Sequence, residues 1–147
     1  MRHRDDMRAR GHVTITVYRN GKVDRRYHRS NLVVNSGLQL LGALLVGTSN
    51  ERAGQLAVGT GTAAPQPTDT TLGNEVIRGA FTSTWQSGSQ LVLSYFLDTT
   101  QANGQTLTEA GLFGTNNTLI ARVTYPPIVK DANTAVSYQW TLLFGAA

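Results

Sequence analysis

Near the amino terminus, apolar and polar residues alternate strictly from His12 to Tyr18. One face of this segment carries only β-branched apolar side chains: Val13, Ile15 and Val17. Period-2 alternation predicts a half-buried β-strand. Asn20-Gly21 follows, and this dipeptide favours a tight hairpin because both residues tolerate positive φ. We therefore predict a β-hairpin over residues 12–30, whose return strand, Lys22–Tyr27, exposes Arg25 and Arg26.

A leucine-rich segment, residues 36–47, is the one convincing helix in the sequence. Ser36 is a suitable amino-terminal cap, and Gly47 is a suitable carboxyl-terminal cap because glycine accepts the left-handed conformation. Helical spacing places three leucines on one stripe: Leu38, Leu41 and Leu45. Since the helix is apolar on most sides, we expect it to lie under a sheet or at a subunit interface.

Short strand patterns separated by turn residues fill the remainder of the chain. They are predicted at Leu56–Val58, Gly79–Gln86, Leu91–Leu97, Leu107–Phe113, Leu119–Tyr125 and Ala135–Phe144. Pro126-Pro127 is expected to end the fifth of these strands, because proline has no N–H for the ladder. The pattern predicts a mainly β fold, an antiparallel β-sandwich of jelly-roll-like type, with a single domain over residues 12–147.

Charge is distributed unevenly along the 147 residues. Residues 1–30 hold nine Lys/Arg and three Asp/Glu, whereas residues 31–147 hold four and six. Residues 1–11 show no periodicity, so we predict a flexible basic arm. The arm and the hairpin together supply the candidate partner-binding arginines: Arg2, Arg4, Arg8, Arg10, Arg25 and Arg26. Such asymmetry suggests an acidic partner surface, either protein or, less favoured, nucleic acid.

Two glutamates stand in apolar surroundings, Glu75 before Val76-Ile77 and Glu109 between Leu107 and Leu112. A buried carboxylate is usually paired, because removing an isolated charge from water costs on the order of several kcal/mol. Arg78 and Arg122 are nearly the only bases nearby in the sequence. We therefore predict ion pairs between these glutamates and arginines that fix strand register or a subunit contact.

No motif in the chain predicts catalysis or a cofactor. There is no cysteine, the three histidines match no metal-ligand spacing, and no Gly-x-Ser-x-Gly occurs. Gly59-Thr-Gly61 is followed by Ala-Ala-Pro-Gln-Pro instead of the helix that a phosphate loop requires. The longest apolar stretch, Leu38–Val46, is about half of the ~20 residues needed to span a membrane. We expect a non-enzymatic protein without cofactor, metal or membrane segment.

Three ordered motifs run through the middle of the chain: Leu-Ala-Val-Gly-Thr-Gly at 56–61, Leu-Gly-Asn-Glu-Val-Ile-Arg at 72–78 and Thr-Glu-Ala-Gly-Leu-Phe at 108–113. Flanking pieces are Asn31–Gly37, Ala121–Val123, Lys130 and Tyr138–Trp140. Over residues 31–144 this pattern resembles a group of bacteriophage virion structural proteins, small tail-associated or capsid-decoration proteins. The resemblance implies a β-sandwich that forms symmetric oligomers, with a Glu and an Arg recurring at these positions.

The expected function is therefore that of a non-enzymatic virion component, made in the host bacterial cytoplasm. Its expected partners are copies of itself, in a trimer or another symmetric oligomer, and capsid or tail subunits. Capsid decoration is slightly favoured over a tail or baseplate role, because no repetitive shaft or heptad stalk is present. The alternative is a tail module that binds host-surface glycan through the loops Gly59–Thr71 and Asp98–Gln105.

Overall fold

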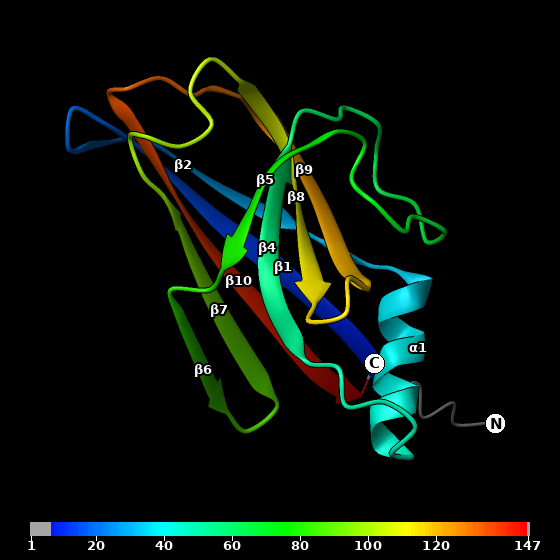
Figure 1. Ribbon diagram of the computed structural model, residues 1–147. Coiled ribbons are helices and arrows are strands. Elements are labelled where there is room, and N and C mark those ends of the chain that lie inside the picture. Colours follow the sequence, from blue (N-terminus) through cyan, green and yellow to red (C-terminus); the bar gives the residue numbers. More distant parts are fainter. Residues whose placement is uncertain (1–6, 147) are drawn as a thin grey trace, which may run out of the picture.

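The computed structural model describes the backbone of residues 7–146 and the side chains of residues 9–145. Its strands form two antiparallel sheets of five strands each (Figure 1). In spatial order, sheet A contains β2 (Lys22–Ser30), β1 (Met7–Arg19), β10 (Thr134–Ala146), β7 (Gln90–Leu97) and β6 (Ser83–Ser87). Sheet B contains β3 (Leu32–Val33), β9 (Leu119–Val129), β8 (Thr106–Gly114), β4 (Ala53–Gly59) and β5 (Glu75–Ala80).

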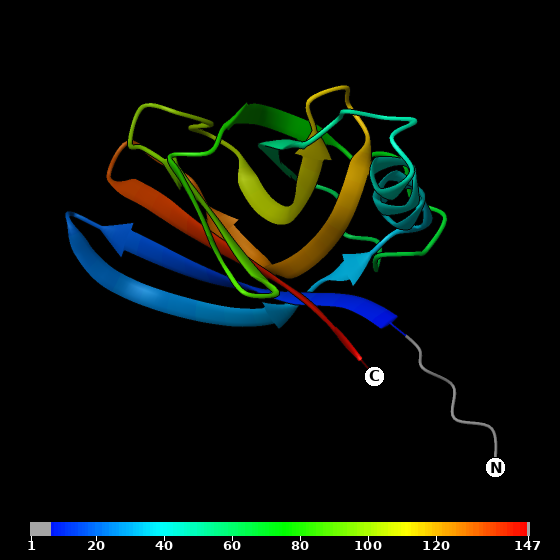
Figure 2. The same ribbon diagram turned by 90° about the horizontal axis from the view of Figure 1, so that it is seen from below.

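The two sheets lie face to face, as Figure 2 shows from below, with β1, β2 and β10 in one layer and β8 and β9 in the other. The inner faces carry the alternating apolar residues of β1, β7 and β10, which pack on those of β8 and β9. Trp140 and Tyr138 are fully buried at the centre, and the Tyr138 hydroxyl lies 2.7 Å from that of Tyr125. The predicted mainly β, antiparallel sandwich is confirmed.

The predicted hairpin is present but begins earlier than expected. β1 starts at Met7 and pairs with β10 along its whole length, from Met7 opposite Ala146 to Arg19 opposite Thr134. The boundary of the flexible arm at residue 11 is therefore wrong, because the carboxyl-terminal strand supplies a ladder partner for residues 7–11. Asn20 and Gly21 have φ of 51° and 76°, as the predicted tight turn requires. Arg2 and Arg4 lie outside the described residues.

The helix α1 spans Asn35–Leu45 and lies beside β9 at one side of the sandwich. Ser36 does not cap it, since its hydroxyl donates to the Leu119 carbonyl at 2.6 Å instead. The amide of Asn35 is satisfied by the Pro67 carbonyl at 2.8 Å. At the other end Gly47 has φ of 74°, and the amides of Gly47 and Thr48 bond to the carbonyls of Leu44 and Ala43 in the glycine-capped pattern predicted.

Two strand boundaries differ from expectation. The segment predicted as one strand, Gly79–Gln86, is divided between β5 in sheet B and β6 in sheet A, because the chain changes sheets at Phe81-Thr82.

β9 continues through Pro126-Pro127 to Val129. Glu109 pairs with Thr124 and Leu107 with Ile128, so three residues of β9 oppose Thr108 alone in a β-bulge. A bulge needs no ladder N–H from its extra residues, which explains why both prolines are tolerated.

β9 is covered by a partner strand on only part of its outer edge. β3 pairs with Ala121 and Arg122 only, and within the described chain no strand pairs with that edge from Thr124 onward. The sandwich is therefore open between this edge and β2. In residues 7–146, no helix has the length and apolar character that crossing a membrane requires.

Candidate functional site

The three central motifs of the sequence meet at one fully buried carboxylate, that of Glu109 on β8. Its two oxygens accept hydrogen bonds from the amides of Gly73, at 3.0 Å, and Asn74, at 2.8 Å. Arg122, on the neighbouring strand β9, donates to it from Nη2 at 2.7 Å and from Nε at 3.2 Å. A buried carboxylate with this many donors remains ionised, since each bond compensates for lost hydration.

Arg122 is itself 2% exposed, and its guanidinium donates to two further acceptors besides Glu109. Nη1 donates to Asp69 at 3.0 Å, and Nη2 also donates to the Ala63 carbonyl at 2.9 Å. Asp69 and Ala63 both belong to the long loop between β4 and β5. The ion pair therefore joins two strands of sheet B to this loop.

Glycines let the loop approach the carboxylate closely. A Cβ built on Gly59 or Gly61 would stand 2.6 Å from a Glu109 carboxylate oxygen, and one on Gly73 would stand 3.0 Å from the Cα of Gly61. The Thr108 hydroxyl closes the arrangement by donating to the Gly61 carbonyl at 2.8 Å. The glycines of the first two motifs thus belong to the packing around Glu109, and no phosphate-binding geometry is needed to explain them.

The other glutamate and arginine considered from the sequence, Glu75 and Arg78, form an ion pair on the surface of β5. Arg78 donates to both carboxylate oxygens, at 2.6 Å and 3.2 Å, and its guanidinium lies 3.8 Å above the centre of the Phe113 ring. A third bond, 2.5 Å long, reaches Asn117 in the β8–β9 turn. Glu109 thus pairs with Arg122 across β8 and β9, and Glu75 pairs with Arg78 within β5.

A second buried carboxylate, Glu51, was not identified from the sequence. It is 6% exposed and accepts bonds from the amides of Asn116, at 2.9 Å, and Thr118, at 3.1 Å, and from the Thr118 hydroxyl at 2.6 Å. Glu51 therefore fastens the β8–β9 turn. The only sequence signal was the polar turn Thr115–Thr118, whose amides need an acceptor, and nothing near Glu51 marks it as that acceptor.

Lys130, also part of the pattern quoted above, is fully buried below the loop between β7 and β8. Its Nζ donates to the Asn103 side chain at 2.8 Å and to the Asp131 carbonyl at 3.2 Å. Burial lowers the pKa of Lys130, while Asp98 and Asp131 act in the opposite direction. The loop is also tied by the Gly104 amide, which donates to the Lys130 carbonyl.

The remaining candidates for chemistry do not converge. His12 and His28 lie exposed on the outer face of sheet A, and His3 lies outside the described residues. Within residues 7–146, no group of three His, Cys, Asp or Glu side chains is placed to hold a metal ion. The large aromatic residues do not gather on one surface either: Trp140, Tyr138 and Tyr95 are core residues, and Trp85 is 54% exposed on the edge strand β6.

The predicted partner-binding arginines that can be placed do not form one surface. Arg10 is exposed on β1, and for Arg8 the structure describes only the backbone, which pairs with Gly145. Arg25 and Arg26 lie on opposite faces of sheet A, since Arg25 pairs with the inward residue Val17 and Arg26 with the outward residue Thr16. Only one of these two neighbours can thus belong to any single binding site.

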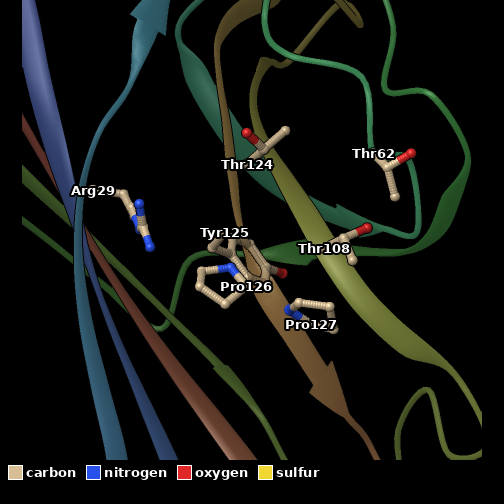
Figure 3. A pocket seen from close by; sticks show the side chains of 7 residues that line it. All are labelled: Arg29, Thr62, Thr108, Thr124, Tyr125, Pro126 and Pro127. Carbon is tan, nitrogen blue, oxygen red and sulfur yellow. The ribbon is translucent and has the colours of Figure 1, made fainter.

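A hollow of about 330 Å³ lies beside the β-bulge (Figure 3). Its lining residues come from β2, the loop after β4, β8 and β9: Arg29, Thr62, Thr108, Thr124, Tyr125, Pro126 and Pro127. In Figure 3 Arg29 extends from β2 on the side opposite Thr108 and Thr62. The hollow exists because the bulge separates β9 from its partner strand next to the open side of the sandwich.

No protein-family model, curated protein or solved structure matches this chain.

We predict that replacing Glu109 by Gln lowers the free energy of unfolding by about 3–5 kcal/mol, because Arg122 then keeps its buried charge without its main partner. The matched control is Glu75→Gln, which breaks an ion pair of the same type at a partly exposed position and should cost less than about 1 kcal/mol. Urea denaturation of both variants measures the difference. Equal losses for the two variants would show that the buried pair has no special weight.

The two buried carboxylates should also make the fold sensitive to acid. Burial alone would raise the pKa of Glu109, but the Asn74 amide, Arg122 and the Gly73 amide together hold it below its ordinary value. Burial would likewise raise the pKa of Glu51, but the hydrogen bonds from Thr118 and Asn116 hold it below its ordinary value. A depressed folded-state pKa stabilises the fold above the unfolded pKa of about 4.3, and this contribution is lost as the pH falls through the folded value.

Unfolding free energies measured across this acidic range should therefore decrease with falling pH in the wild type. The decrease should be smaller in the Glu109→Gln variant, because the substituted side chain no longer titrates. Identical pH slopes for the two proteins would mean that Glu109 does not contribute.

Proposed function

We propose that this chain is a non-enzymatic structural protein of a bacteriophage virion that assembles as a symmetric oligomer, with capsid decoration slightly favoured over a tail or baseplate position. The observation that carries the proposal is the exposed apolar surface of α1. The resemblance of the sequence to virion proteins gives the proposal its setting, and the packing of α1 gives it a physical basis.

Only Gly37 and Leu40 of α1 are buried, with Gly37 placed directly against the backbone of Ile120. The predicted stripe of Leu38, Leu41 and Leu45 lies away from this contact. Leu38 is 47% and Leu45 79% exposed, Leu41 is half-buried, and the adjacent Val46 is 74% exposed. Contiguous apolar residues of this kind are characteristic of an interface between subunits.

A second copy of the chain is the simplest partner for this stripe. The helix α1 and the following Val46 contain no charged residue, so a symmetric contact through this surface brings no like charges together. In such a contact one patch serves both subunits, which suits a protein that repeats over a particle. The packing around Glu109 supports the same function, since internally fastened loops make a rigid building block.

Glycan recognition through the two long loops receives less support. The Gly59–Thr71 loop is bound to Arg122 through Ala63 and Asp69, and the Asp98–Gln105 loop is held by Lys130. The Asp69 carboxylate and the Asn103 amide oxygen are occupied by these contacts, so they are not free to bind a ligand.

The purified protein should form an oligomer of defined size in size-exclusion chromatography with light scattering. Leu45→Lys should shift it towards the monomer, because burial of a leucine stabilises by about 1.5–3 kcal/mol, roughly tenfold or more in the dissociation constant. Val23→Lys is the matched control, since Val23 is 55% exposed on the distant hairpin. A wild type that stays monomeric at every concentration would refute the proposed assembly.

Gold-labelled antibodies against this protein should decorate purified phage particles in negative stain. Label over the whole head supports decoration, and label confined to one vertex or the tail supports a tail or baseplate position. Particles that carry no label, alongside protein detected in lysed host cells, would contradict a virion location.

A further inference from the structure

The open side of the sandwich contains an elongated hollow that the proposed oligomer does not use. The hollow at the β-bulge, about 330 Å³, meets a second hollow of about 180 Å³ at Pro127, which lines both. The second hollow continues along β2 and the end of β9, past Arg25, Tyr27 and Val129. We call the two together the β2–β9 cleft. The larger part lies at the lower end of the range of about 300–1,000 Å³ that is usual for ligand sites.

One wall of the β2–β9 cleft is basic. Arg25, Tyr27 and Arg29 alternate along β2 and pair with the inward residues Val17, Ile15 and Val13, so all three project towards β9. The cleft lining includes a third guanidinium, Arg19, and a single carboxylate, Asp24, which Arg19 already binds at 3.0 Å. Among the described residues Arg29 makes no ion pair. The cleft therefore has positive charge left for a ligand.

The opposite wall combines hydroxyl groups with the apolar rings of two prolines. Pro126 and Pro127 present their rings to the larger hollow beside Tyr125 (Figure 3). The hydroxyls of Thr108 and Tyr125 are used internally, by the carbonyls of Gly61 and Glu109. Within the described chain the hydroxyls of Thr62 and Thr124 have no such partner, so they remain for a ligand.

We propose that the β2–β9 cleft binds an acidic oligosaccharide, with a sugar carboxylate on the guanidinium of Arg29. A guanidinium binds a carboxylate through two parallel hydrogen bonds, which gives orientation as well as strength. Thr62 and Thr124 supply partners for sugar hydroxyls, and the proline rings suit the C–H face of a pyranose. This site shares only Thr62 with the two long loops considered above, and it does not depend on the proposed oligomer.

Two other kinds of ligand fit the cleft less well. A peptide strand adds to a sheet edge through backbone hydrogen bonds, and Pro126 and Pro127 offer no N–H at this part of β9. Single-stranded nucleic acid requires exposed aromatic rings for base stacking. Tyr125 is 6% exposed, with its hydroxyl bound in the core, so it offers no such platform.

Binding is tested by titrating the full chain with trigalacturonate, a hyaluronan tetrasaccharide and sialyllactose, followed by calorimetry and amide NMR shifts. Maltotriose and lactose are the uncharged counterparts. At least one acidic sugar should bind, shifting amides of β2 and of the bulge. Arg29→Ala should weaken it roughly tenfold or more, as expected for a hydrogen-bonded charge pair.

Arg26→Ala is the matched control, because it removes the same charge from the same strand but on the outer face of sheet A. It should change the affinity by less than about twofold, as expected for an exposed charge outside the contact. Equal weakening by both variants would overturn the proposal, because it would show nonspecific attraction to a basic strand. Equal affinity for the uncharged sugars, or no acidic sugar bound at millimolar concentration, would also overturn it.

An oligothymidylate is included to separate the two polyanions. Tighter, Arg29-dependent binding of the oligothymidylate would overturn the sugar proposal in favour of nucleic acid. Repeating the titration with the Leu45→Lys variant keeps this test separate from the assembly proposal. Acidic-sugar binding that persists in the monomer is expected, and its loss there would show that the cleft is not a site of the single chain.

Discussion

The ion pair between Glu109 and Arg122 is the interaction on which the rest of sheet B depends. It is fully buried, and the desolvation of both charges is offset only because the Gly73 and Asn74 amides, Asp69 and the Ala63 carbonyl complete their hydrogen bonding. The pair therefore stabilises the fold only when the β4–β5 loop is in place. The β4–β5 loop, β8 and β9 therefore become ordered together during folding. This explains why motifs far apart in the sequence meet in one part of sheet B.

Most of the sandwich could be predicted from the sequence because its strands follow simple alternation. β1, β7 and β10 alternate buried and more exposed residues over most of their length, whereas β8 is an apolar strand that is buried on both faces. The Asn20-Gly21 turn and the Gly47 cap depend on local backbone preferences. The errors arose where tertiary contacts override local rules. The bulge tolerates Pro126-Pro127 within β9, the β10 ladder extends β1 to Met7, and the change of sheet at Phe81-Thr82 divides a continuous strand pattern.

The site was predictable in part for a similar reason. That Glu109 pairs with an arginine could be predicted because an unpaired charge in apolar sequence is costly and few bases are available. This argument uses the cost of burial and needs no knowledge of where the residues lie in space. The approach of Gly59 and Gly61 to that carboxylate could not be derived, because it depends on how a loop without periodicity folds back. Glu51 was missed because its partners are backbone amides of a distant turn, which no residue type identifies.

The internal use of the acids also changes what the net charge of +4 means. Glu109, Glu51, Asp69 and Glu75 are all engaged within sheet B, so they contribute little field at the surface. The bases of β2 have no comparable partners: among the described residues, Asp24 is the one acid of the hairpin, and it binds Arg19 on β1. Among the described residues, exposed positive charge is therefore concentrated along β2, beside the open edge of the sandwich. The apolar surface lies on α1, so the fold separates a region suited to self-association from one suited to an acidic ligand.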